Sequence, residues 1–166
     1  MTIIVMGVAG AGKSTVGSLL ANTQGWTFVD ADSFHPPANI EKMSHGIPLS
    51  DADRAPWLAA IHERIVHASH SQENIVIACS ALKQCYRDVL ANGVTIQWVY
   101  LKSSMEQIRE RLLQRRNHFM NADLLASQFA DLEEPQDAIV ADSALPAPVL
   151  VRQIMDALRR RTPQEA

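Results

Sequence analysis

The segment Gly7–Ser14 combines the residue types that bind a nucleoside triphosphate. It matches the pattern G-x-x-x-x-G-K-[ST] and stands between a short apolar run and a helical pattern. Small residues let backbone N–H groups turn toward phosphate oxygens, and the helix that follows adds the positive end of its dipole. Lys13 brings a charge to the β- and γ-phosphates, and the hydroxyl of Ser14 is the expected Mg²⁺ ligand. The expected nucleotide-binding residues of this loop are Gly7, Val8, Ala9, Gly10, Ala11, Gly12, Lys13, Ser14 and Thr15.

Two aspartates, Asp30 and Asp32, follow the second apolar run as an Asp-x-Asp pair. No Asn-Lys-x-Asp motif of a GTPase occurs. The strand-end acid of motor and transport ATPases is also missing, because later apolar runs end at Cys79 and Leu101. A magnesium ion beside bound phosphates still needs a nearby carboxylate. We expect the two carboxylates to point differently, so that Asp30 holds the metal with Ser14 and Asp32 faces an acceptor hydroxyl.

A cluster of arginines follows the fourth apolar run. Such a run is most often a solvated face, but Arg111 and Arg115 are four residues apart and share one side of a helix. One guanidinium can stack on a base while another reaches phosphates. Because phosphoryl transfer needs a cover that keeps water out, we expect Arg111 to bind the nucleotide and Arg115 to offset charge on the transferred group. Residues 115–125 are the expected lid.

Five apolar runs alternate with helical patterns along the chain. The expected strands cover residues 2–6, 27–29, 74–79, 95–101 and 138–141. Helices are expected over 13–21, after a cap at Ser50, after a capping box of Ser103 with Glu106, and around 150–158. This alternation predicts an α/β fold, with a parallel sheet covered by helices on both faces and one domain over residues 1–166.

Length and composition exclude several functional classes. The 166 residues suit one domain with its own core. Lys and Arg number 15 against 18 Asp and Glu, which gives a net charge of −3. Bulk binding to nucleic acid or to an anionic membrane usually needs a positive surplus, so neither partner is expected. Two cysteines cannot form a disulfide framework, and no basic segment of a secretory signal precedes the first apolar run, which favours a cytoplasmic protein.

Beyond the phosphate loop, segments from about residue 3 to residue 158 resemble, in order and spacing, those of the gluconokinase family. These are small ATP-dependent kinases in the group of shikimate and nucleoside-monophosphate kinases. The resemblance is carried by Asp30–Pro36, Asn39–Met43, Gly46–Leu58, Cys79–Lys83, Tyr86–Asp88, Arg115–Met120, Gln128–Phe129 and Leu132–Pro135.

This resemblance implies a fold, a reaction and a mechanism. The implied fold is a three-layer α/β/α P-loop kinase fold with a five-stranded parallel sheet and a mobile lid. The implied reaction is phosphorylation of D-gluconate at its 6-hydroxyl by ATP and Mg²⁺, and members of the family often form dimers. In that reaction Asp32 accepts the hydroxyl proton, while Lys13 and Arg115 offset charge on the transferring group.

Gluconate presents several hydroxyls and one carboxylate, so its site needs hydrogen-bonding groups and a cation. Related kinases hold a substrate carboxylate with an arginine in the segment after the Asp-x-Asp loop, which makes Arg54 the first choice. Lys83 and Arg87 are the second choice, because residues four apart on a helix share a face. The implied substrate-binding residues are Asp32, His35, Arg54, Ser80, Lys83 and Arg87.

Two other functions stay open. In the first, the chain is a kinase whose acceptor is another small hydroxy acid such as shikimate, or a nucleotide. The block Gly46–Leu58 argues against both acceptors. Alternatively, the chain is a nucleotide-binding regulatory module without transfer activity, which the full set of Lys13, Ser14 and Asp32 argues against. ADP release in the presence of gluconate, shikimate and AMP distinguishes the three.

Overall fold

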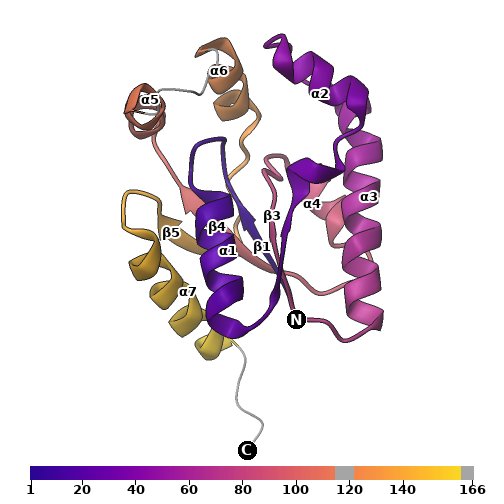
Figure 1. The fold of residues 1–166 in the computed structure, drawn as a ribbon, viewed down its shortest axis with the longest axis vertical. Helices are drawn as coiled ribbons and strands as arrows, with labels where there is room; N and C mark the ends of the chain where they lie inside the picture. Colours follow the sequence, from indigo (N-terminus) through magenta and orange to yellow (C-terminus); the bar gives the residue numbers. More distant parts are fainter. Residues whose placement is uncertain (115–121, 162–166) are drawn as a thin grey trace, which may run out of the picture.

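One five-stranded parallel sheet organises the computed structural model, which describes residues 1–114 and 122–161. The strands lie in the order β2-β3-β1-β4-β5, so β1 is central, with β3 on one side and β4 on the other (Figure 1). Their bounds are β1 (Thr2–Met6), β2 (Thr27–Asp30), β3 (Ile75–Ala78), β4 (Gln97–Lys102) and β5 (Ile139–Asp142). The predicted parallel sheet is confirmed, and the expected ranges differ from the observed ones only near the strand ends.

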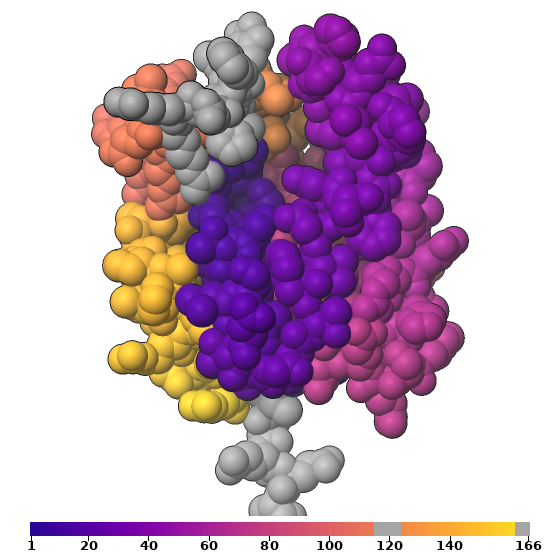
Figure 2. All heavy atoms as spheres, in the orientation of Figure 1, coloured from indigo at the N-terminus to yellow at the C-terminus, as the bar shows by residue number. Residues whose placement is uncertain are grey.

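Helices cover both faces of this sheet, which confirms the predicted three-layer α/β/α fold. α1 and α7 pack side by side on one face (Figures 1 and 2), and α3 and α4 cover the other (Figure 1). None of the helices in the described ranges is long and apolar enough to cross a membrane. Their bounds are α1 (Lys13–Gln24), the 3₁₀ turn η1 (Ala31–Phe34), α2 (Pro37–Ser44), α3 (Asp51–His70), α4 (Gln84–Leu90), α5 (Met105–Gln114), α6 (Ala122–Asp131) and α7 (Ala147–Arg161).

Local capping explains where two of these helices begin. The Ser50 cap is confirmed, because its hydroxyl accepts from the Asp53 backbone N–H while the Asp53 carboxylate accepts from the Ser50 N–H. The capping box predicted at Ser103 is wrong, and the structure forms it one residue later, between Ser104 and Gln107. The Ser103 hydroxyl instead pairs with that of Ser143, 2.6 Å away.

Alternate residues of the central strand serve the two halves of the core. In β1, Ile3 and Val5 pack in the layer with α1 and α7, whereas Ile4 and Met6 pack in the layer with α3. All four side chains are fully buried. Such two-sided burial is typical of parallel strands and explains why β1 reads as a continuous apolar run.

Trp57 of α3 anchors the loop that follows β2. Its indole Nε1 donates a hydrogen bond of 2.7 Å to the carbonyl oxygen of Ala31, and both residues are buried. The ring also stacks on His35, with centroids 4.5 Å apart and planes 8° from parallel. The backbone on either side of Asp32 is therefore fixed to the second helical layer.

Replacement of Trp57 by Phe removes this hydrogen bond and leaves the buried Ala31 carbonyl without its donor. We expect a loss of about 1–3 kcal/mol in unfolding free energy, seen as a melting temperature lower by about 3–10 °C. Trp98→Phe, on the half-buried Trp98 of β4, is the matched control. Equal melting temperatures for wild type and Trp57→Phe would show that this anchor contributes nothing.

Candidate active site

The phosphate loop leaves the carboxyl end of β1 and needs glycine at two tight places. Gly7 has φ of 146°, and a Cβ there would lie 2.9 Å from the carbonyl oxygen of Leu101 in β4. Gly12 has φ of 95° and is the left-handed N-cap of α1. The loop therefore turns sharply into a helix N-terminus at the point where the strand order reverses, which is where α/β proteins bind phosphates.

Lys13, at the first position of α1, lies over this loop. Its Nζ donates to the carbonyl oxygen of Val8 at 3.0 Å. Burial lowers the pKa of Lys13, and the nearby Asp32 and Asp30 carboxylates act in the opposite direction. The ammonium group is thus held at the phosphate loop with two carboxylates close by.

Ser14 and Asp30 supply the oxygen atoms suited to a magnesium ion. The Ser14 hydroxyl donates to Asp30 Oδ2 at 2.7 Å, which joins the start of α1 to the end of β2. A hydroxyl and a carboxylate are the hard oxygen donors that Mg²⁺ prefers, so this pair fits the ion. The described ranges contain no cluster of three or more His, Cys, Asp or Glu side chains around a metal position.

Asp32 follows Asp30 by two residues, and its side chain is exposed to solvent. Its side chain is 83% exposed, while its backbone N–H donates to Asp30 Oδ1 at 3.0 Å. One carboxylate is therefore tied to Ser14 and the loop backbone, and the other is free to meet an incoming molecule. The two aspartates differ in direction because Asp30 ends β2 while Asp32 lies in the 3₁₀ turn η1. Strand alternation, on which the prediction relied, does not explain the difference, since residues two apart in a strand share a face.

His35 lies behind Asp32, with its imidazole against Trp57 and its side chain only 6% exposed. Its Nε2 is 4.0 Å from Asp32 Oδ1, and Asn39 Nδ2 is 3.4 Å from its Nδ1. Burial lowers the pKa of His35, partly opposed by Asp32 and reinforced by the positive charge of Arg54. His35 thus lies beside Asp32, the predicted base, and stacks on Trp57, one helical turn beyond Arg54.

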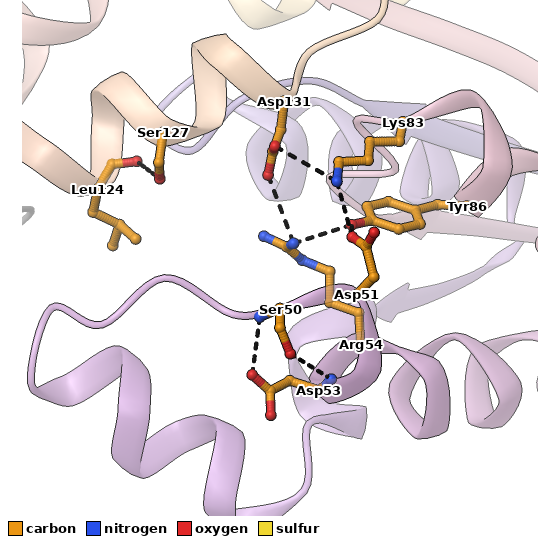
Figure 3. A network of polar contacts seen from close by, with 9 residues as sticks. All are labelled: Ser50, Asp51, Asp53, Arg54, Lys83, Tyr86, Leu124, Ser127 and Asp131. Atoms are coloured by element: carbon orange, nitrogen blue, oxygen red, sulfur yellow. Dashed lines mark hydrogen bonds and ion pairs between the residues drawn. The ribbon is translucent and has the colours of Figure 1, made fainter.

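Arg54 and Lys83 come from different elements and meet in one polar cluster (Figure 3). Arg54 Nη1 donates to the Tyr86 hydroxyl at 3.1 Å and lies 3.6 Å from Asp131 Oδ2. Lys83 Nζ donates to Asp51 Oδ1 at 2.9 Å and lies 3.7 Å from Asp131 Oδ1. Two cations predicted to bind substrate are therefore brought together, and two carboxylates accompany them.

Tyr86 and Asp51 belong to the same cluster and are bonded to each other. The Tyr86 hydroxyl donates a short hydrogen bond to Asp51, whose pKa is lowered by that bond and by the bond from Lys83. Burial raises the pKa of Tyr86, and its bond to Asp51 acts in the same direction. Both residues lie in segments that carry the family resemblance, but their types alone gave no indication of this role.

Arg87 points away from this cluster. Sequence spacing placed Lys83 and Arg87 on one helix face, but Lys83 is the N-cap of α4 and precedes its first turn. The buried guanidinium of Arg87 instead donates to the carbonyl oxygens of Ala81 and Leu82, both at 2.9 Å, and to Gln84 Oε1. Arg87 therefore supports the loop that carries Lys83.

Ser80 and Arg111 contact the phosphate loop through its backbone. The Ser80 carbonyl accepts from the Gly7 N–H at 3.4 Å. Arg111 Nη1 lies 3.3 Å from the carbonyl oxygen of Gly10, and Nη2 donates to the Ser143 carbonyl. Thr15 is exposed at the start of α1. Arg115 and the lid segment 115–121 lie outside the described residues.

Gln128 of α6 also reaches the phosphate loop, a contact that sequence patterns did not reveal. Its side-chain oxygen Oε1 accepts from the Ala9 backbone N–H at 2.7 Å. Asp131 is one helical turn further along α6, so one face of this helix contacts both the phosphate loop and the Arg54 cluster. Gln128 lies in a segment of the family resemblance, whereas Asp131 carried no signal.

Comparisons with known proteins identify the family of the chain. The family model "Shikimate kinase" matches residues 9–159. A gluconokinase of Gluconobacter oxydans is 48% identical over 81% of this chain and 76% of its own, and a probable gluconokinase of Rattus norvegicus is 42% identical over 95% and 97%. The crystal structure of a gluconokinase from Sinorhizobium meliloti superposes with a TM-score of 0.87 at 44% identity, covering 96% of this chain and 92% of that one. The chain therefore belongs to the gluconokinase family, within the wider group that the shikimate kinase model describes.

Proposed function

We propose that this protein transfers the γ-phosphoryl group of ATP to the 6-hydroxyl of D-gluconate. The observation that carries the proposal is the position of Asp32 beside both the phosphate loop and Arg54. Ser14, at the start of α1, bonds Asp30 two residues before Asp32, and Asp32 lies 4.0 Å from His35, which stacks on Trp57 one helical turn beyond Arg54. The gluconokinase names of relatives that match most of the chain support the same acceptor.

The chemistry of gluconate fits this spacing of charges. The acceptor is a flexible polyol with an anionic group at one end and a primary hydroxyl at the other. Arg54, with Lys83 beside it, is the cation for the carboxylate, and a guanidinium can hold it through two parallel hydrogen bonds. The exposed carboxylate of Asp32 then receives the far hydroxyl, and His35 is placed to hydrogen-bond a hydroxyl between them.

In the transfer step the 6-oxygen of gluconate attacks the γ-phosphorus of ATP. The bond from this phosphorus to the β,γ-bridging oxygen breaks, ADP leaves, and the hydroxyl proton passes to Asp32. Lys13 and the N–H groups of the phosphate loop offset the charge on the transferred group, a role we extend to Arg115. Because the transition state is loose, holding the hydroxyl in line matters as much as the basicity of Asp32.

Ser14 and Asp30 are the residues that we propose to hold magnesium, Asp30 through a bound water. When bound, the ion neutralises charge on the β- and γ-phosphates. The direct bond between the Ser14 hydroxyl and Asp30 keeps both oxygen donors at the end of β2, beside the loop. Arg111 is proposed to lie against the nucleotide, since its guanidinium borders Gly10.

We place this activity in one kinase domain with a lid over residues 115–125, in the cytoplasm. The exposed thiol of Cys85 and the buried thiol of Cys79 are both unpaired, which suits a reducing compartment. Burial raises the pKa of the Cys79 thiol to about 12, so this sulfur stays protonated and unreactive at neutral pH.

The proposal is tested by ADP release from the purified chain with ATP and a panel of gluconate, shikimate and AMP. We expect turnover with gluconate well above that with the other two acceptors. Preference for shikimate or AMP would assign a different kinase, and the absence of turnover with all three, while ATP still binds, would favour a regulatory module.

Asp32→Asn should lower turnover by about 10²- to 10⁴-fold without abolishing gluconate binding, because the amide keeps a hydrogen-bonding oxygen but cannot take the proton. Asp30→Asn should instead raise the Mg²⁺ concentration needed for activity, and added Mg²⁺ should partly restore its rate. A magnesium titration of the two variants compares them directly. Rescue of Asp32→Asn but not of Asp30→Asn would mean that the two roles are reversed.

Arg54→Met should raise KM for gluconate by about thirtyfold or more and leave KM for ATP nearly unchanged, because a charge-pair partner is lost from a mostly buried position. Arg87→Met is the matched control: it should cost about 2–3 kcal/mol of stability through the loop carbonyls, without a comparable change in KM. A selective rise in KM for gluconate in a stable Arg87→Met variant would show that Arg87 binds the acceptor.

A further inference from the structure

Among the residues that the structure describes, the polar cluster around Arg54 is electrically balanced. It contains two cations, Arg54 and Lys83, and two carboxylates, Asp51 and Asp131 (Figure 3). Entry of an acceptor carboxylate would leave this partly buried group of charges with a net negative charge. Such an excess is unfavourable where water is limited, so one of the resident carboxylates must give way.

The two carboxylates are held very differently. Asp51 accepts a short hydrogen bond from Tyr86 and a 2.9 Å hydrogen bond from Lys83, and it lies in the first turn of α3. Within residues 1–114 and 122–161, Asp131 makes ion pairs alone, at 3.6 Å to Arg54 and 3.7 Å to Lys83, both longer than a hydrogen bond. Asp131 is therefore the carboxylate that is easier to displace.

The position of Asp131 also suits displacement. It is the last residue of α6, and its side chain points from that helix toward the two cations (Figure 3). One turn earlier on the same face, Gln128 accepts from the Ala9 N–H of the phosphate loop. The same face of α6 thus gives one oxygen to the nucleotide half of the site and two to the acceptor half.

We propose that Asp131 is an internal competitor for Arg54 and Lys83, so that it sets the affinity for an acidic acceptor and releases the end of α6 when that acceptor binds. The inference rests on the proposed function, because it takes the acceptor to be a carboxylic acid. It assigns Asp131 a positioning role through the two cations and no part in the chemical step.

The test compares Asp131→Asn with wild type in KM for gluconate and for ATP, and in the dissociation constant for gluconate by calorimetry. We expect gluconate to bind about three- to tenfold more tightly to the variant, because its cations are no longer shared, while KM for ATP moves by less than twofold. Asp131→Glu, which keeps the charge, should resemble wild type. Asp137→Asn removes an exposed carboxylate paired with Arg161 and is the matched control.

Two further arms distinguish competition from a structural effect. The inhibition constant of D-glucitol, which has the hydroxyls but no carboxylate, should be equal for wild type and Asp131→Asn. In an Arg54→Met background, Asp131→Asn should lose most of its gain in gluconate affinity. Unchanged or weaker gluconate binding by Asp131→Asn, or an equal gain for D-glucitol, would overturn the proposal. Thermal melts of both Asp131 variants check that they are folded.

Failure of the proposed function has a separate signature, namely absence of gluconate turnover by the wild-type chain. In that case the comparison is made with the acidic acceptor that the substrate panel identifies. Equal affinity of wild type and Asp131→Asn for that acceptor would overturn the competition by itself.

Discussion

The parallel pairing of β1 between β3 and β4 is the constraint on which the rest of the site depends. It brings the carboxyl ends of the strands to one edge of the sheet, and it makes the chain cross from one side of β1 to the other. Parallel strands all end at the same edge of the sheet. The phosphate loop that follows β1 and the two aspartates at and just after the end of β2 therefore meet at that edge. The hydrogen bond from Ser14 to Asp30 joins these two strand ends directly.

Helices of the second layer then hold the loops that follow strands β2 and β3. α3 contributes Trp57, which holds the backbone at Ala31. One turn before Trp57, the same helix contributes Arg54 to the polar cluster. Arg87 of α4 performs a similar task for the loop after β3 by binding its carbonyl groups. The proposed acceptor site is thus assembled from separate segments. Contacts between residues 32 and 35 positions apart join α3 to the start of α4, and buried hydrogen bonds of Trp57 and Arg87 anchor the neighbouring loops.

Sequence patterns were sufficient for the sheet, the phosphate loop and the two aspartates, because these depend on local apolar runs and on a motif with a defined loop geometry. They failed where a side chain had a choice of partners at similar spacing. Ser103 and Ser104 are equally good caps by type, and only the loop after β5 decides between them. Arg87 was expected to share a helix face with Lys83, but Lys83 precedes the helix and Arg87 binds the carbonyl groups of Ala81 and Leu82. Asp131 was missed because its partners are Arg54 of α3 and Lys83 at the cap of α4, both distant in sequence, and no local pattern reports such a contact.

The central claim is that gluconate is held by its carboxylate at Arg54 and presents its far hydroxyl to Asp32. The position of the new phosphate ester tests this orientation most directly, since a reversed or sliding acceptor would be phosphorylated elsewhere. Phosphorus and carbon NMR of the product formed from ATP and gluconate would locate it. We expect a single ester at O6, and an ester at any other hydroxyl, or free phosphate alone, would rule out this orientation of gluconate.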